Sequence, residues 1–185
     1  GMGVGISLGN LAGHVAKNGG MGVISTAHPG YRAEDFEKNP TEVNKRELAK
    51  EIQKAKEIAK GKGMVAINAM VAITDYAQMV EVAIKNKIDA IISGAGLPMN
   101  LPGFVKGTKV KIAPIVSSGK AARLICKTWD RRYHVAPDFV VIEGSEAGGH
   151  LGFHKEDVLN KTTAKLADIF KEVKETLQPF VEKYQ

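Results

Sequence analysis

His150 is the residue whose type and setting best suit it to catalysis. It follows Gly148 and Gly149 in the run EGSEAGGHLGF, and we expect this run to be a loop from which the ring can project into a cleft. Imidazole is a common general base near neutral pH. The residue type alone does not decide the role, because a single histidine on a loop is more often only exposed.

Other polar residues are weaker candidates. Asn68 interrupts the apolar run from 64 to 73, and an unsatisfied amide in a buried strand is costly, so it must bond either backbone or a ligand. Glu143 and Glu146 are candidate acid–base groups without a fixed partner. His154, four residues after the catalytic candidate, could share a metal with it on a helix. The intervening sequence and the lack of a nearby third ligand argue against this, so we expect no metal.

Short apolar runs that end in small or polar residues predict five strands, at 22–25, 64–73, 90–93, 109–116 and 139–142. In parallel α/β folds, binding groups lie beyond the carboxyl ends of the strands. Glycines there let a ligand approach the backbone and leave N–H groups free for phosphate or an electron-rich ring. The five ends together favour a planar, anionic cofactor. The alternative is that any parallel sheet has glycines in its turns.

Amphipathic stretches between these runs predict helices, which indicates βα units and a parallel sheet. One helix is expected at 8–17. Asn44 and Glu47 resemble a capping box, and Leu48, Ile52, Ala55 and Ala59 share the buried face of the helix that follows. A last helix is expected from about 163, which Pro179 should kink or end.

Composition bounds the class of protein. The 185 residues carry a net charge of +6, but lysines alternate with glutamates on helical stretches, which favours solvated faces over a nucleic-acid partner. No apolar run is long enough to cross a bilayer. Cys126 is the one cysteine, so we expect no internal disulfide and a cytoplasmic protein. We expect a single domain over 1–185, and the glycine-rich start and the helical end both look cut.

The run EGSEAGGHLGF resembles the nitronate monooxygenase family, formerly called 2-nitropropane dioxygenases. GMGVGISLGNLAGHVAKNGGMGVIST is similar to that family's first loop and helix, MVAINAMV to its third strand and IISGAGLP to its fourth. The resemblance covers nearly the whole chain. It implies a TIM-type barrel that binds FMN and an enzyme that uses O2 to oxidise nitronates or nitroalkanes.

The resemblance also implies roles for individual residues. His150 matches the family's catalytic histidine, the base that takes the proton next to the nitro group. Met2 and Gly3 would lie against the flavin, and Asn68 would hydrogen-bond it. The residues that would line the flavin site are Glu143, Gly148 and Gly149.

The sequence departs from the family pattern in the number of strands. A closed barrel needs eight strands and about 250 residues, whereas this chain corresponds to about strands two to six. The usual phosphate loops follow strands seven and eight, so we expect no fully enclosed FMN within this chain. Two unpaired sheet edges then favour a homo-oligomer.

Two alternatives to a nitronate monooxygenase remain open. One is a flavin-type enoyl-acyl carrier protein reductase that uses NAD(P)H, because those enzymes share the barrel and the glycine–glycine–histidine motif. The long polar stretch HPGYRAEDFEKNPTEVN mildly favours the nitronate monooxygenase branch. The other alternative is a catalytically inactive barrel fragment.

Overall fold

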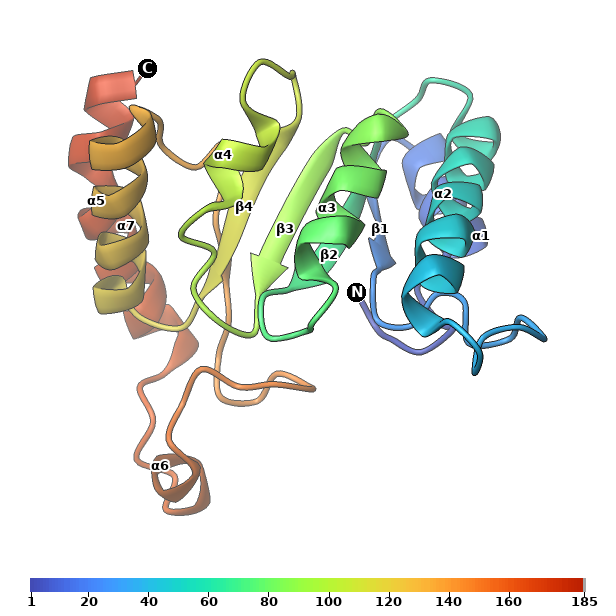
Figure 1. Ribbon diagram of the computed structural model, residues 1–185. Helices are drawn as coiled ribbons and strands as arrows, with labels where there is room; N and C mark the ends of the chain where they lie inside the picture. Colours follow the sequence, from blue (N-terminus) through green and yellow to red (C-terminus); the bar gives the residue numbers. More distant parts are fainter. Residues whose placement is uncertain (185) are drawn as a thin grey trace. The chain divides into compact units, whose positions relative to one another are not determined.

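The alternation of apolar and amphipathic segments becomes strands and helices in the computed structural model, which describes residues 1–184 (Figure 1). Within these residues, five strands form a sheet in the order β1-β2-β3-β4-β5, so strands adjacent in sequence are adjacent in the sheet. β1 and β2 pair in parallel, as do β4 and β5. The strands are β1 (Met21–Ser25), β2 (Met64–Met70), β3 (Ala90–Gly94), β4 (Lys111–Val116) and β5 (Val141–Ile142).

A helix connects each strand to the next, which is the crossover that parallel neighbours require. This succession of βα units is the topology of part of a TIM-type barrel. The predicted α/β class and partial barrel are confirmed. The helices of the described chain are α1 (Gly9–Lys17), α2 (Pro40–Ala59), α3 (Tyr76–Lys85), α4 (Leu101–Val105), α5 (Gly119–Tyr133), α6 (Lys155–Leu159) and α7 (Leu166–Tyr184).

The chain divides into two compact units, the first made of residues 1–92 and 104–111 and the second of residues 93–103 and those from 112 onward. In the first unit, α1 and α2 pack on each other and α1 packs on β1. A Cβ added at Gly22 would lie 1.8 Å from the carbonyl oxygen of Ala12, so only glycine permits this approach of β1 to α1. The expectation of a single domain stays a prediction.

The apolar faces read from the sequence are the ones that pack. The predicted face of α2 is confirmed, because Leu48, Ile52 and Ala55 are fully buried and Ala59 nearly so. In the second unit, α5 packs on α7, and the buried Trp129 donates its indole N–H to the carbonyl oxygen of Pro98 across 3.0 Å. No helix among residues 1–184 combines the length and the apolar character needed to cross a membrane.

The start of α2 differs from the prediction. Asn39 is the N-cap and accepts a hydrogen bond from the N–H of Glu42, and Pro40 occupies the first turn. Asn44 is instead buried inside the helix, where its Oδ1 accepts from the N–H of Gly30 at 3.1 Å. The capping-box interpretation was wrong because proline suits the first turn of a helix, where no N–H is needed.

Several boundaries also differ. β2 ends at Met70 and not at Ile73, because the N–H of Ile73 closes a turn on the carbonyl of Met70. α7 does not end at Pro179 but continues to Tyr184. Its last turn is held by hydrogen bonds from Lys183 and Tyr184 to Asp130 on α5. The short helices α4 and α6 were missed.

Candidate functional site

The loop after β5 presents His150 to solvent. The N–H of Glu143 bonds the carbonyl oxygen of Val116 at 2.9 Å and so extends the β4–β5 ladder by one residue. From Glu146 to His150 the chain is exposed, and no hydrogen bond to the imidazole is found among the described residues. The structure therefore places His150 as the sequence predicted, on an accessible loop at the carboxyl end of a strand.

The two glycines before His150 leave the backbone uncovered. A Cβ added at Gly148 or Gly149 would meet nothing within 4 Å. Gly149 has a φ of +87°, a conformation that L side chains rarely adopt. An open, glycine-lined backbone of this kind suits close approach by a flat ring or an anion.

Hydrogen bonds tie this loop down at both ends. Ser117, the residue after β4, donates from Oγ to the carbonyl oxygen of Gly152 at 2.8 Å. The N–H of Gly152 donates to Oε2 of Glu143 at 3.3 Å. Near the start of the loop, Thr163 Oγ1 donates to Ser145 Oγ at 2.9 Å. Ser117 directly follows the strand predicted at 109–116, but nothing in the sequence indicated its contact with the histidine loop.

In the first unit, Asn68 projects from the partly exposed face of β2. Side chains alternate along a strand, and Val65, Ile67 and Ala69 are buried on the opposite face. Asn68 Nδ2 donates to the carbonyl oxygen of Ile92 at 3.3 Å, and Oδ1 accepts from the nitrogen of Gly1 at 3.0 Å. Both partners are main-chain groups, so the role of Asn68 toward a flavin stays a prediction.

The same contact brings the amino-terminal segment to the end of β2. Met2 is 64% exposed, and its backbone N–H donates to Ser7 Oγ at 2.9 Å. A Cβ at Gly3 would lie 2.6 Å from the Cβ of Ala27, so glycine is needed for this course of the chain. The structure therefore places Met2, Gly3 and Asn68 in one neighbourhood of the first unit.

Two further histidines, His28 and His154, lie in local structural settings. His28 packs edge-to-face on Phe36 at 5.7 Å, and its Nδ1 lies 3.4 Å from Nδ2 of Asn44. His154 is the N-cap residue of α6. Over residues 1–184, no group of three or more His, Cys, Asp or Glu side chains is arranged to hold a metal ion.

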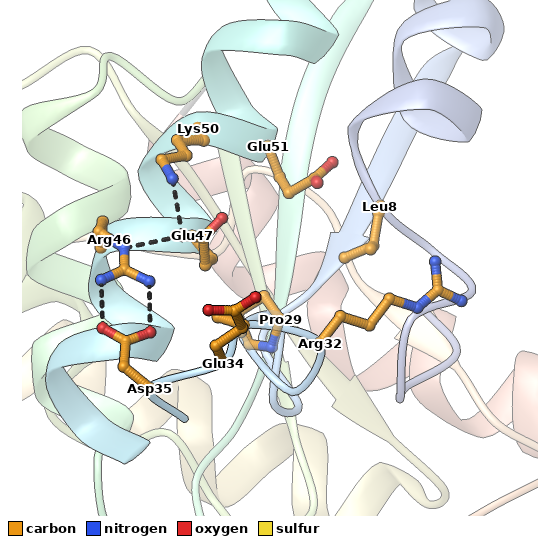
Figure 2. A pocket seen from close by; sticks show the side chains of 11 residues that line it. Leu8, Pro29, Arg32, Glu34, Asp35, Arg46, Glu47, Lys50 and Glu51 are labelled. Atoms are coloured by element: carbon orange, nitrogen blue, oxygen red, sulfur yellow. Dashed lines mark hydrogen bonds and ion pairs between the residues drawn. The ribbon is translucent and has the colours of Figure 1, made fainter. Parts of the chain in front are cut away.

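A hollow of about 540 Å³ in the first unit is highly charged (Figure 2). Arg46 on α2 holds Asp35 through two hydrogen bonds of 2.7 and 2.9 Å, and both Arg46 and Lys50 bond Glu47 at 2.8 Å. These contacts lower the pKa of Asp35 to about 2 and raise that of Arg46. None of the site residues predicted from the sequence lines this hollow. The Arg46–Asp35 ion pair joins the loop before α2 to that helix, whereas the pairs of Glu47 with Arg46 and Lys50 lie within α2.

Comparison with known protein families covers most of the chain, including the loop of His150. A family model described as nitronate monooxygenase matches residues 1–178. The chain belongs to the nitronate monooxygenase family. This confirms the resemblance read from the sequence and makes the chain part of a family of oxidoreductases. No curated protein sequence matches the chain.

Solved structures support the fold of this nitronate monooxygenase family chain. FabK from Thermotoga maritima is 24% identical with a TM-score of 0.62, and the match covers 89% of this chain and 47% of FabK. Nitroalkane oxidase from Streptomyces ansochromogenes is 16% identical with a TM-score of 0.71, and the match covers 95% of this chain and 54% of the oxidase. The chain therefore spans about half the length of the structures it matches.

Proposed function

We propose that this chain supplies the proton-abstracting part of an FMN-dependent nitronate monooxygenase, which uses O2 to oxidise alkyl nitronates and nitroalkanes. The observation that carries the proposal is the exposed His150, which follows two open glycines and has no hydrogen-bond partner among the described residues. A general base must be able to reach its substrate and must have a nitrogen that is free to accept the proton. His150 meets both requirements.

The step assigned to His150 is removal of a proton from the carbon that bears the nitro group. An unprotonated ring nitrogen accepts this proton, and the electron pair of the broken C–H bond moves onto the nitro oxygens to give the nitronate. The resulting imidazolium and nitronate carry opposite charges, so they attract each other. A substrate supplied as the nitronate has already lost this proton and needs no base.

The residues of the chain fit the ring of FMN better than its phosphate. Gly148 and Gly149 offer an open backbone, and we propose that Met2, Gly3, Asn68 and Glu143 also contact the flavin. When bound, FMN would supply the oxidation of the nitronate and the reaction with O2. In TIM-type barrels the phosphate commonly lies in the loops after strands seven and eight, which the five described strands do not include.

A second candidate is an FMN-dependent enoyl-acyl carrier protein reductase that takes hydride from NAD(P)H. The likeness of the fold to FabK favours it. The two candidates use different donors and acceptors, so substrates distinguish them. Oxidation of NADH with an enoyl thioester, together with no reaction on nitronates, would select the reductase.

The experiment that tests the function uses the complete gene product that contains this chain. The purified protein is examined for a flavin spectrum, and then O2 consumption and nitrite release are measured with a short alkyl nitronate. We expect a yellow protein that releases nitrite. A flavin-free protein without turnover would favour an inactive barrel.

A homo-oligomer and a cytoplasmic location are further parts of the proposal. The cytoplasmic location is proposed because the single cysteine is a free thiol.

A further inference from the structure

The loop that carries His150 has a composition that would leave it mobile if nothing restrained it. Three glycines, Gly144, Gly148 and Gly149, fall within the eight residues from 144 to 151. Glycine has the largest conformational freedom of any residue, so ordering such a loop costs much entropy. A base that samples many positions is a poor catalyst, because proton transfer requires a fixed geometry.

We propose that Ser117 and Gly152 are positioning residues that fix the place of His150. They form what we call the clasp, the hydrogen bonds from Ser117 Oγ to the Gly152 carbonyl oxygen and from the Gly152 N–H to Glu143 Oε2. The proposal rests on the proposed role of His150 as the base. The clasp holds the chain two residues beyond His150, so the loop is closed on the strands that it leaves.

The register of the sheet explains why the clasp closes there. Val116 and Ile142 are paired residues of β4 and β5, and Ser117 and Glu143 are the next residue of each strand. Both side chains therefore leave the same end of the same strand pair. Their two hydrogen bonds reach one peptide segment, Gly152, from a donor and an acceptor that differ in chemistry, which fixes its orientation as well as its position.

Gly152 is suited to this contact because it has no side chain. A Cβ added there would lie 2.3 Å from Ser117 Oγ and 3.1 Å from Ser117 Cβ. Any larger residue would therefore displace the hydroxyl from the carbonyl oxygen that it bonds. Gly152 is therefore required by its close contact with Ser117, whereas Gly148 and Gly149 have no such neighbour within 4 Å.

The test compares Ser117→Ala with Ser118→Ala in the isotopically labelled chain. Ser118 is the neighbouring hydroxyl, but it caps α5 by accepting from the N–H of Ala121 and bonds nothing in the loop. Ser117→Thr keeps a hydroxyl and serves as the conservative variant, and Gly152→Ala breaks the clasp by adding bulk. Amide order parameters of residues 148–152 are measured by NMR, with the His150 ring signal assigned from a His150→Gln variant.

We expect these order parameters to fall from the rigid range, about 0.85, to below about 0.6 in Ser117→Ala and Gly152→Ala. They should stay high in the wild type, in Ser118→Ala and in Ser117→Thr. Unchanged order in Ser117→Ala, equal loss in Ser118→Ala, or a loop already mobile in the wild type would each overturn the clasp. If Ser117→Ala does not fold, Gly152→Ala alone decides.

A kinetic arm on the complete gene product separates the clasp from the proposed function. Displacing the base by about 1 Å should lower kcat on a neutral nitroalkane by up to about a hundredfold, with KM nearly unchanged and with recovery in Ser117→Thr. If the loop loses order and this turnover does not fall, the clasp stands but His150 is not the base. If no nitro compound is turned over at all, the proposed function fails, and the NMR result still decides the clasp.

Discussion

Ser117 Oγ donates a hydrogen bond to the carbonyl oxygen of Gly152 across 2.8 Å, although 35 residues separate the two in the sequence. The contact joins the carboxyl end of β4 to the chain just beyond His150. The loop that carries the candidate base is thus hydrogen-bonded to the residues that follow β4 and β5.

Replacing Asn68 by Leu should weaken flavin binding while leaving the fold largely intact. The change removes the donor to the Ile92 carbonyl and the acceptor of the Gly1 nitrogen, so the amino-terminal segment with Met2 and Gly3 loses an anchor. The loss of about 1 kcal/mol for a hydrogen bond corresponds to a Kd for FMN raised about fivefold or more. Fluorescence titration of the complete gene product with FMN measures it.

Asn68→Asp is the matched control for this prediction. It keeps an acceptor for Gly1, loses the donor to the Ile92 carbonyl and adds a negative charge. Because the anchor of the amino-terminal segment is kept, its FMN affinity should lie nearer to that of the wild type than the affinity of Asn68→Leu does. An Asn68→Leu protein that binds FMN as tightly as the wild type would show that Asn68 serves the backbone alone.

Stability in acid should depend on Arg46. Its two hydrogen bonds lower the pKa of Asp35 to about 2, whereas the pKa of an Asp in an unfolded chain is about 3.9. A carboxyl whose pKa is depressed on folding stabilises the fold above its unfolded pKa, and this contribution is lost as the pH falls from about 4 toward 2. Both side chains are about half exposed, so the effect should be small.

Urea unfolding of Arg46→Gln and wild type at pH 5 and pH 3 measures this dependence. The difference between the two proteins should shrink as the pH is lowered. Lys45→Gln removes a cation on the same helix that pairs with Glu42 and not with Asp35, so it should not change the acid dependence in this way. A wild-type advantage that is independent of pH would contradict the assignment.

The thiol of Cys126 should be unreactive in the folded protein. It is fully buried on α5, and burial raises its pKa to about 11. At pH 8 a thiol reagent should label no cysteine in the native chain and one cysteine per chain in denaturant. Because the folded pKa is raised, the contribution to stability is present below about pH 8.5 and is lost as the pH rises toward 11. Rapid native labelling would show that this part of α5 opens.

Self-association is expected at the sheet edges. In the sheet of the described residues, β1 and β5 each have one neighbouring strand, and large apolar side chains are exposed, among them Ile6, Leu159 and Phe170. Unpaired strand edges are templates for pairing with another chain. Light scattering at high concentration should give a mass above that of one chain. A monodisperse monomer that carries stoichiometric FMN would refute both this expectation and that of an incomplete phosphate site.

The sequence was sufficient for the features that depend on local periodicity. Buried runs such as 64–70 and the apolar face of α2 follow from the spacing of apolar residues, so the strands, the α/β class and the partial barrel could be predicted. The place of His150 at the end of the last strand followed in the same way. A strand end next to a glycine-rich run is a local signal.

Other features depend on contacts between distant residues or on choices between similar local signals. The bond of Ser117 to Gly152 cannot be read from either neighbourhood, because both residues are ordinary in a loop. Asn39 and Asn44 are both good caps by type, and only the buried bond of Asn44 to Gly30 decides between them. Pro179 remains within α7, where contacts of Lys183 and Tyr184 with Asp130 hold the final turn.

The measurement that tests the central claim most directly is the turnover of a neutral nitroalkane and of its nitronate by His150→Ala, in the complete gene product. Loss of a general base typically costs about a hundredfold to ten-thousandfold, and we expect that loss on the nitroalkane but much less on the nitronate, which needs no deprotonation. His154→Ala removes a nearby histidine without a proposed role and should leave both rates unchanged. Equal loss on the two substrates would contradict the assignment of His150 as the base.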